Sequence, residues 1–435
     1  ELGPHVTPIV QIQATSNPKI KMGEYYDALE TRDAAQREAE QFELLREQLR
    51  YAKREVPAYT ALLGEVNPDA VSVRDALAKL PVTRKSELAQ AQADSPPLGG
   101  YCALSGHTLP RVFSSPGGIF EPQGTGSDFW RTARALYAAG CREGDLLHNT
   151  FSYHFTPAGF MLEGGAHALG CTVFPAGTGQ SELQVRAIAH LRPRAYVGTT
   201  SFLKILLDKA DEMGVSLSPL TIGLVSGEAL PTSLREELAT KGVHVLQAYA
   251  TADVGLIGYE SPAREGLILD EQVLVEIVRP GTGDPVAPGE VGEVLVTTLQ
   301  PGYPLIRFAT GDLSAFMEGV SGCGRTNQRI KGWMGRADQA AKVRGMFVHP
   351  SQIAQVASRH QAITRARLVI ERADNADKMT LHCELTAGAE HSPALTDDIA
   401  ISIREVCKLR GEVEFFLQGA LPNDGKVIDD LRPLG

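Results

Sequence analysis

The chain has 435 residues, of which 43% are hydrophobic and 22% charged, a composition typical of a soluble globular protein with two or more domains. The formal net charge of -10 argues against nucleic acid as a partner. No uncharged apolar stretch is long enough to cross a bilayer, so no membrane association is expected. The first residues lack a basic start followed by an apolar run, which predicts no signal peptide.

The six cysteines lie far apart, and none forms a CxxC pair. This spacing argues against a zinc knuckle and against a disulfide framework. A reducing, cytoplasmic compartment is therefore expected.

The N-terminal region predicts helices. Residues 33–54 contain no Gly or Pro and carry Phe42, Leu45 and Leu49 at helical spacing, and Pro57 closes that helix. The following segment LPVTRKSEL, residues 80–88, predicts a turn and then a helix with Thr83 as its N-cap and Glu87 in the first turn.

A glycine-rich stretch follows at residues 111–128, RVFSSPGGIFEPQGTGSD. Ser114, Ser115, Gly117 and Gly118 would let the backbone wrap closely around an anion such as a phosphate. No Lys or Thr follows the glycines within the next few positions. The stretch is therefore a nucleotide site with altered parts, an inactive one, or only a turn.

From residue 144 to residue 242, short apolar strands alternate with helices. The predicted strands cover residues 144–151, 171–176, 195–200 and 221–227, and the predicted helices cover 157–170, 184–193, 202–214 and 230–242. This alternation predicts an α/β fold with a mainly parallel sheet covered by helices on both faces. Ligands bind such sheets at the carboxyl ends of the strands, where GTTS, VSGEAL and AYATADVG follow.

The pattern changes after Asp270. Residues 272–299 predict a β-hairpin, and a smaller unit then carries a helix at 351–360, strands at 366–371 and 379–385, a helix at 394–409 and a last strand at 412–417. We predict a large N-terminal domain, residues 1–335, with a β-rich subdomain, and a small, mobile α+β domain, residues 336–435.

Polar residues gather on turns after apolar strands. Tyr249 offers a stacking face, Thr251 a hydroxyl for phosphate and Asp253 a hard oxygen ligand for Mg²⁺, while Asp312 is suited to two vicinal hydroxyls. Singly, each has a plainer explanation: strand-end packing for Tyr249, a helix cap for Asp253 and turn chemistry for Asp312. Lys426 alone would be surface charge.

Together and in order, these segments resemble the adenylate-forming enzymes, most closely the phenylacetate–CoA ligase family. The resemblance spans nearly the whole chain, from VPAYTALL near the start to DGKVIDDLR at the end, and is densest over residues 271–314 and 322–353. It implies an ATP-dependent ligase for an aromatic or arylacetic acid, which forms an acyl-adenylate and then a thioester with coenzyme A. It also implies a homodimer.

The resemblance assigns roles to individual residues. It implies adenine contacts at Gly227, Glu228, Ala229 and Tyr249, a nucleotide contact at Ala250, phosphate contacts at Ser114, Ser115, Gly117, Gly118 and Thr251, and ribose contacts at Asp312 and Arg336. Asp338 would be the hinge of the small domain. Lys426 would bridge the carboxylate and the α-phosphate, where a cation stabilises developing charge.

Three features depart from the family pattern. The lysine that usually follows the loop glycines is missing, and Asp253 stands where the family usually carries Glu. Relatives that bind zinc use Cys and His residues, but here only Cys323 remains, with Ser261 and Ser321 nearby. A tetrahedral structural site needs four ligands, so no structural zinc is expected.

The acyl pocket is expected in HNTFSYHFTPAGF, residues 148–160. Phe151, Tyr153 and Phe155 would line a flat slot for an aryl ring, and His154 would touch its carboxylate. The alternative is that these side chains only pack the edge of the sheet. Two other functions stay open: an adenylating enzyme with an acceptor other than coenzyme A, and a nucleotide- or acyl-AMP-binding protein without catalysis.

Overall fold

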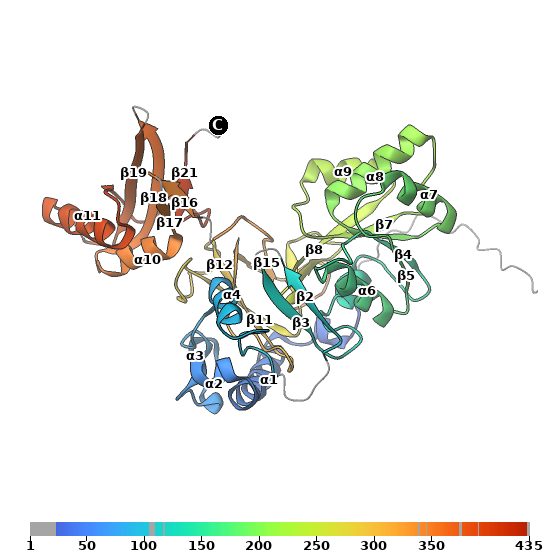
Figure 1. Cartoon of the computed structure of the whole chain (residues 1–435), viewed down its shortest axis with the longest axis horizontal. Coiled ribbons are helices and arrows are strands. Elements are labelled where there is room, and N and C mark those ends of the chain that lie inside the picture. Colours follow the sequence, from blue (N-terminus) through green and yellow to red (C-terminus); the bar gives the residue numbers. More distant parts are fainter. Residues whose placement is uncertain are drawn as a thin grey trace, which may run out of the picture.

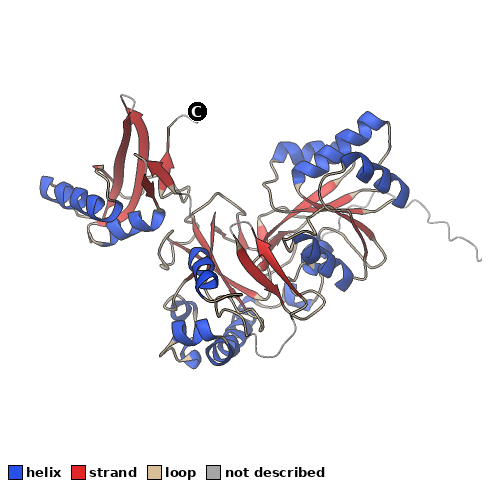
Figure 2. Ribbon diagram, in the orientation of Figure 1, coloured by secondary structure: helices blue, strands red, loops and turns tan. Residues whose placement is uncertain are grey.

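The computed structural model describes residues 23–103, 109–115, 118–337, 340–344, 346–373, 376–389 and 391–432. Two sheets with their helices make up the large part of the molecule, and a smaller unit built by the C-terminal residues lies beside it (Figures 1 and 2). Within the described ranges, no helix is both long and apolar enough to cross a membrane.

The largest sheet has nine strands in the order β14-β15-β10-β9-β8-β7-β6-β4-β5. Its parallel half confirms the predicted alternation and consists of β4 (Leu146–Asn149), β5 (Thr172–Pro175), β6 (Ala195–Gly198), β7 (Ile222–Val225) and β8 (His244–Thr251). Its antiparallel half consists of β9 (Gly255–Glu260), β10 (Leu267–Leu269), β14 (Phe316–Met317) and β15 (Arg329–Ile330).

Helices cover both faces of the parallel half because its strands are apolar on both sides. Ala195 and Val197 of β6 pack in one buried cluster with residues of α5 and α6, whereas Tyr196 packs in another with residues of α7, α8 and α9. This is the side-chain alternation of a strand buried on two faces. The helices are α5 (Ala133–Ala138), α6 (Ala158–Ala168), α7 (Ser181–Leu191), α8 (Thr200–Met213) and α9 (Thr232–Thr240).

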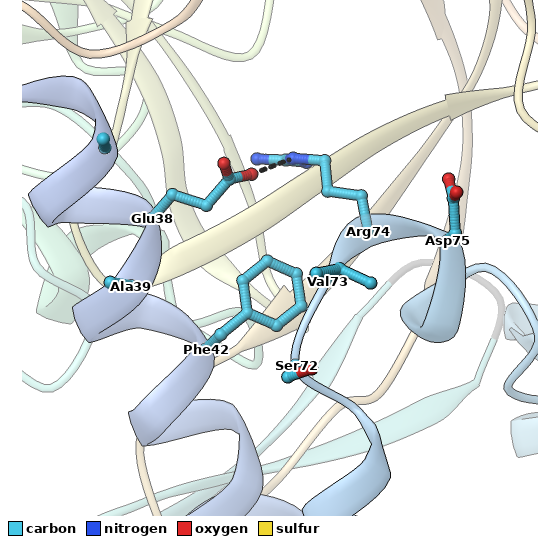
Figure 3. A pocket seen from close by; sticks show the side chains of 8 residues that line it. Glu38, Ala39, Phe42, Ser72, Val73, Arg74 and Asp75 are labelled. Carbon is cyan, nitrogen blue, oxygen red and sulfur yellow. Dashed lines mark hydrogen bonds and ion pairs between the residues drawn. The ribbon is translucent and has the colours of Figure 1, made fainter.

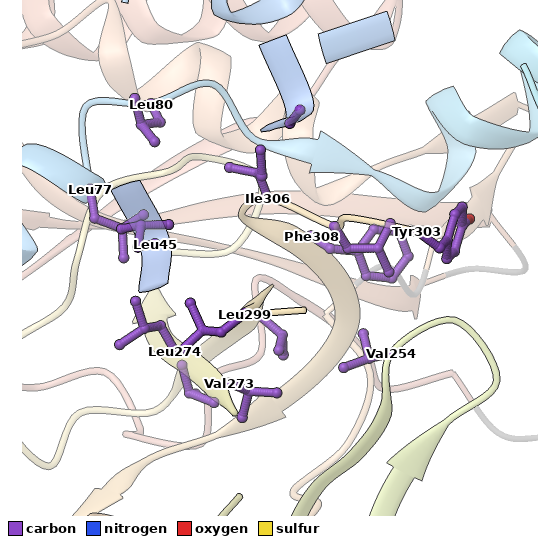
Figure 4. Close-up of a cluster of buried hydrophobic side chains, with 14 of the residues drawn as sticks. Leu45, Leu77, Leu80, Val254, Val273, Leu274, Leu299, Tyr303, Ile306 and Phe308 are labelled. Atoms are coloured by element: carbon purple, nitrogen blue, oxygen red, sulfur yellow. The ribbon is translucent and has the colours of Figure 1, made fainter. Parts of the chain in front are cut away.

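A second sheet has the order β1-β13-β12-β11 and packs against the N-terminal helices. Figure 4 shows this core, where Leu45 and Leu77 of the helices meet Leu274 and Phe308 of the sheet. Its strands are β1 (Thr83–Arg84), β11 (Val273–Val278), β12 (Gly292–Thr298) and β13 (Phe308–Ser314). The helical elements are η1 (Ala28–Thr31), α1 (Ala34–Glu55), α2 (Pro57–Leu63), η2 (Pro68–Ala70), α3 (Arg74–Leu77) and α4 (Lys85–Asp94).

The prediction that Thr83 caps a helix is wrong. Thr83 lies in β1, opposite Phe308 of β13, and its hydroxyl donates to the carbonyl oxygen of Ile306 at 3.0 Å. The helix α4 begins at Lys85, and the backbone N–H of Arg84 donates to the Glu87 carboxylate at 3.4 Å. A partner more than 200 positions away thus takes the hydroxyl that local spacing assigned to the helix.

The glycine-rich stretch forms an antiparallel hairpin of β2 (Arg111–Ser115) and β3 (Ile119–Gln123). Ser115 lies opposite Ile119 in the register, at the end of the hairpin. Residues 116 and 117, and with them the predicted phosphate contact Gly117, lie outside the described residues.

The C-terminal unit has its own hydrophobic core, drawn from residues between Ala341 and Ile428. A four-stranded sheet, ordered β20-β19-β18-β21, carries the helices on one side (Figure 1). The elements are β16 (Ala341–Val343), β17 (Met346–Val348), α10 (Pro350–Ser358), β18 (Ile363–Ala373), β19 (Ala376–Leu385), α11 (Pro393–Cys407), β20 (Glu412–Phe416) and β21 (Ile428–Asp430). Because this unit has a core of its own, we propose that the large and small domains divide between residues 335 and 336, as the sequence predicts.

The prediction that residues 412–417 form the last strand is wrong, because β21 follows and pairs in parallel with β18. The buried guanidinium of Arg367 on β18 binds the carboxylates of Asp424 and Asp429 at 2.9 and 2.8 Å. These ion pairs fix the loop before β21 to the sheet.

The two parts meet at this same loop. The backbone N–H of Val291 donates to the side-chain oxygen of Asn423 at 3.1 Å. Gly425 has a φ of +72°, and a Cβ there would lie 2.5 Å from the Val291 side chain. Only glycine fits this approach.

The buried side chain of Arg307 offers a test of what stabilises the second sheet. Its side chain is 1% exposed and binds both carboxylate oxygens of Glu276 at 3.0 Å, together with the carbonyl oxygens of Ala78, Leu80 and Gly283. We expect Arg307→Met to lower the free energy of unfolding by about 3–5 kcal/mol, because it leaves the Glu276 charge buried and unpaired.

The measurement is urea unfolding followed by fluorescence. Arg186→Met is the control, since Arg186 and Glu182 form an exposed pair on α7, and it should change stability by about 1 kcal/mol or less. Equal losses in both variants would contradict the structural role of the buried pair.

Candidate functional site

A pocket of about 380 Å³ lies where β7 and β8 end. Its lining brings together six residues that the sequence assigned to nucleotide binding, namely Gly227, Glu228, Ala229, Tyr249, Ala250 and Asp312. They come from the turn after β7, from β8 and from β13 of the second sheet. The pocket thus lies at the carboxyl edge of the parallel strands, where sheets of this class bind ligands.

Asp312 is the most constrained of these residues. One carboxylate oxygen accepts the Tyr249 hydroxyl at 2.8 Å, and the other accepts the indole N–H of Trp333 at 3.0 Å and a guanidinium N–H of Arg336 at 2.9 Å. Burial and the Asp312 charge hold the pKa of Tyr249 well above its usual value, so its hydroxyl remains a donor. Each carboxylate oxygen has two acceptor positions, which leaves room for a ligand hydroxyl.

Trp333 and Lys331 line the same pocket, and the sequence interpretation did not select them. Trp333 is 54% exposed, which is unusual for a large aromatic side chain whose N–H is hydrogen-bonded. An exposed ring at the mouth of a polar pocket offers a stacking surface. The signal was present in the sequence, because KGWMG directly precedes Arg336.

The turn after β7 faces the pocket through its backbone. Gly227 has a φ of +80°, and the Phe151 ring lies 3.9 Å from the position that a Cβ would take there. The Glu228 carboxylate turns toward α8, where it accepts the backbone N–H and the hydroxyl of Ser201 at 3.0 and 2.8 Å. Glu228 therefore orders the turn with its side chain, and its backbone remains available to a ligand.

The predicted acyl-pocket residues make different contacts. Phe151 borders Gly227, and the Tyr153 hydroxyl donates to Glu163 at 2.8 Å. His154 and Phe155 pack edge to face, and the Phe155 ring is 69% exposed. The slot stays a prediction, with Phe151 the residue nearest to the nucleotide pocket.

A backbone hydrogen bond joins the hairpin β2–β3 to the predicted acyl-pocket segment, residues 148–160. The backbone N–H of Ser114 donates to the carbonyl oxygen of Phe155 at 2.9 Å, so it is already engaged. The backbone N–H of Gly118 donates to the Ser115 carbonyl oxygen at 3.1 Å. Phosphate contacts by Ser114, Ser115 and Gly118 stay a prediction, and these two N–H groups would have to exchange partners to make them.

Asp253 lies in the turn between β8 and β9 and is buried. The ammonium of Lys85, the first residue of α4, binds one of its oxygens at 2.8 Å. The Thr251 hydroxyl accepts the backbone N–H of Val254 at 3.1 Å and shapes the same turn. Lys85 was missed by the sequence interpretation because it lies 168 positions from Asp253.

Lys426 does not line the nucleotide pocket in this structure. Its ammonium binds Asp429 at 3.2 Å, and its side chain is about half exposed. Asp338, the predicted hinge, lies outside the described residues. Both assignments stay predictions, and the Lys426 assignment requires the small unit to move.

A second pocket, of about 310 Å³, lies between the large part and the small unit. Lys85 and Gly311 line it on one side, and His349, Pro350 and Ser351 at the start of α10 line it on the other. Gly311 precedes Asp312 in β13, so adjacent residues of this strand line the two pockets. The small unit therefore contacts the large part next to the nucleotide pocket.

Cys323 lies in the segment where no structural zinc is expected from the sequence, and that expectation stays a prediction. Burial by itself would raise the pKa of its thiol, but hydrogen bonds from Ser261, Ser321 and Arg325 lower the pKa below its usual value. The Ser321 hydroxyl lies 3.1 Å from the sulfur. In the part of the chain that the structure describes, no group of three or more His, Cys, Asp or Glu side chains is arranged to hold a metal ion.

One further hollow, of about 460 Å³, lies between α1 and α3 and shares no lining residue with the nucleotide pocket. Figure 3 shows Phe42 below it and the ion pair of Glu38 and Arg74 across it, with an N···O distance of 2.9 Å. Because these charges already pair with each other, the hollow offers a ligand little beyond an apolar surface.

The comparisons with known proteins agree with this geometry. The AMP-binding enzyme family matches residues 129–301. The chain is 32% identical over 380 residues to the phenylacetate-coenzyme A ligase of Thermus thermophilus. That alignment covers 83% of this chain and 84% of the Thermus protein. Over 383 residues it is 30% identical to the phenylacetate-coenzyme A ligase of Pseudomonas putida, covering 84% and 85%. The chain belongs to the phenylacetate–CoA ligase family.

A solved structure of the same fold is an open conformation of 2-hydroxyisobutyryl-CoA ligase in complex with 2-HIB-AMP and CoA. It matches with a TM-score of 0.68 and 24% identity, covering 91% of each chain. Family membership makes the present chain an AMP-forming acid–CoA ligase.

Trp333 supplies a direct test of the pocket. The sequence holds only two tryptophans, and the other, Trp130, is buried in the core. We expect AMP to change the fluorescence of the wild type and of Trp130→Phe, and to leave that of Trp333→Phe unchanged. Asp312→Ala should weaken AMP binding about tenfold or more, because it removes charged hydrogen bonds.

The measurement is a fluorescence titration with AMP, repeated by calorimetry for Trp333→Phe, which has lost the reporter. Asp284→Ala, in the turn after β11, is the matched acidic control. Unchanged AMP affinity in Asp312→Ala would contradict the assignment of this pocket.

Proposed function

We propose that the protein converts an aromatic or arylacetic acid to its CoA thioester through an acyl-adenylate formed at the pocket below Asp312. The observation that carries the proposal is the buried carboxylate of Asp312, held by donors from Tyr249, Trp333 and Arg336 at the carboxyl edge of the sheet. Three of the four acceptor positions of this carboxylate are occupied, and the open one suits a hydroxyl of a ribose.

In the first step, a carboxylate oxygen of the acid attacks the α-phosphorus of ATP, and pyrophosphate leaves. Adenine would lie against the backbone of residues 227–229, beside Tyr249 and Ala250, with the ribose on Asp312 and Arg336. Ser114, Ser115, Gly117, Gly118 and Thr251 are proposed for the phosphates. The cost of bringing two anions together falls when a fixed cation lies between them.

Lys426 is the proposed cation. Its ammonium lies at Asp429, so the small unit has to turn about the proposed hinge Asp338 to bring Lys426 to the pocket. In the second step the thiol of coenzyme A, as thiolate, attacks the acyl carbon and AMP leaves. The pocket between the large part and α10 is the proposed approach for this second substrate.

The preference for an aromatic acid rests on Phe151. Its ring lies 3.9 Å from the position that a Cβ of Gly227 would take, and Gly227 lines the nucleotide pocket. The Tyr153 ring packs against Phe160 in the same segment. Together with His154 and Phe155, these residues remain the proposed acyl pocket.

Mg²⁺ is proposed as the metal that accompanies ATP, with Asp253 as its protein ligand. Asp253 fits this role, because it is a buried carboxylate with one oxygen, Oδ1, that has no hydrogen-bond partner within the described chain. Bound Mg²⁺ neutralises phosphate charge and usually takes only one or two carboxylates from the protein.

A homodimer and a cytoplasmic location are also proposed. The dimer follows from the family resemblance, and light scattering tests it. The six cysteines are all free and buried, which agrees with a reducing compartment.

The acid preference is tested by ATP–pyrophosphate exchange with a panel of aryl, arylacetic and short aliphatic acids. We expect exchange with the aryl or arylacetic acids, and CoA thioester formation with the same acids. Exchange restricted to aliphatic acids would overturn the substrate proposal. Exchange without thioester formation would show that the acceptor is not coenzyme A, and no exchange despite AMP binding would overturn catalysis.

Lys426→Ala tests the proposed cation. We expect exchange to fall about 10²–10³-fold with AMP affinity unchanged, because the ammonium stabilises charge that develops only in the transition state. Lys378→Ala is the matched control in the small unit, where Lys378 pairs with Glu412 at 3.0 Å and is similarly exposed. Equal activity in the two variants would exclude Lys426 from the reaction.

A further inference from the structure

Polar atoms that lack hydrogen-bond partners gather at the base of the hairpin β2–β3. Within the described chain they are the Ser115 hydroxyl, both carboxylate oxygens of Glu121, one carboxylate oxygen of Asp253 and the Tyr303 hydroxyl. All four side chains belong to residues that are only 2–5% exposed. Buried polar groups are nearly always satisfied in native proteins, so such a concentration needs a physical reason.

Electrostatics places these groups next to one another. Burial and, after it, the charge of Asp253 raise the pKa of Glu121 to about 8, against the opposing effects of Ser115 and Lys85. Burial also raises the pKa of Tyr303, followed by the charges of Asp253 and Glu121. Both carboxylates thus lie close to each other and to the phenol.

The cluster connects segments that are far apart in the chain. Ser115 ends β2, Glu121 lies in β3, and Asp253 lies in the turn between β8 and β9. Tyr303 comes from the loop before β13, at the edge of the core shown in Figure 4. The hairpin therefore presents its carboxylate to the turn that carries the proposed Mg²⁺ ligand.

The charges in the cluster do not balance. When Glu121 and Asp253 are both ionised, two carboxylates meet one ammonium, that of Lys85, which binds Asp253 at 2.8 Å. An uncompensated charge away from water is costly, and a proton or a cation has to offset it. Carboxylate and hydroxyl oxygens are hard donors of the kind that Mg²⁺ prefers, and a Mg²⁺ ion needs no third acidic ligand because water and phosphate oxygens complete its shell.

We propose that Glu121 and Asp253 together hold one divalent cation of the Mg²⁺ class, with the hydroxyls of Ser115 and Tyr303 beside it. The loop between Ser115 and Gly118 has no lysine after its glycines. The ion supplies the positive charge that the hairpin lacks, at the end of the hairpin assigned to phosphate. Glu121 is thus a metal ligand contributed by β3, directly after the altered loop.

This inference deepens the proposed function and rests on it for the purpose of the ion. Binding of the ion to the protein alone does not depend on the acid substrate. Its test therefore uses Mn²⁺ as the probe, with the full chain and without nucleotide or carboxylic acid.

Mn²⁺ binding is measured by the electron paramagnetic resonance signal of the free ion and by calorimetry. We expect the wild type to bind one Mn²⁺, Mg²⁺ to displace it, and Glu121→Gln and Asp253→Asn each to weaken binding tenfold or more. Glu384→Gln is the control, because Glu384 is a comparably buried carboxylate in the small unit, where it accepts the backbone N–H of Leu421 at 2.7 Å.

Thermal unfolding without metal checks the fold of each variant. Glu121→Gln replaces a buried carboxyl group whose two oxygens have no partner by a neutral amide of similar size, so its melting temperature should stay close to that of the wild type, and the increase caused by Mn²⁺ should disappear. Absence of Mn²⁺ binding at millimolar concentration, or equal affinity in the wild type and Glu121→Gln, would overturn the inference and leave a proton shared between the carboxyl groups.

The two proposals fail in different ways. Mn²⁺ binding that depends on Glu121, without pyrophosphate exchange for any acid, would overturn the ligase function and retain the metal site. Exchange that is unaffected by Glu121→Gln, with no Mn²⁺ bound to the free protein, would retain the ligase function and remove Glu121 from the site.

Discussion

The carboxylate of Asp312 joins three segments that would otherwise have no fixed relation to one another. Tyr249 reaches it from the nine-stranded sheet, and Asp312 itself belongs to the second sheet. Trp333 and Arg336 lie on the segment that leads to the small unit. A buried carboxylate requires donors, and these are the donors that the fold provides. One set of hydrogen bonds therefore connects the pocket, the two sheets and the segment that leads to the small unit.

Much of the fold could be predicted from local patterns. The helix α1 and the alternating elements from β4 to α9 followed from periodicity, because their burial is regular along the sequence. Thr83 and β21 could not be predicted in this way. Thr83 lies in a two-residue strand that pairs with Phe308 of β13, and β21 pairs with β18 across some 60 positions. Neither strand therefore has a local signature in the sequence.

The site was predicted in part. Gly227 and Tyr249 line one pocket because one follows β7 and the other lies near the end of β8. Asp312 lines it from within β13, so the prediction that it lies on a turn is wrong. Lys85 and Glu121 were not selected, because a lysine at the start of a helix and a glutamate in a short strand have no chemical pattern of their own. Only the fold shows that both lie beside Asp253.

Arg367 gives the loop that carries Lys426 a mechanical property. Its guanidinium binds Asp424 before the lysine and Asp429 after it, so the loop is clamped at both ends to β18. Bending of the loop alone would then move the Lys426 ammonium only a short distance. A larger displacement requires the sheet of the small unit to move with it. In the proposed reaction the position of one charge would report the orientation of the whole unit, and solvent viscosity would act on the step that delivers it.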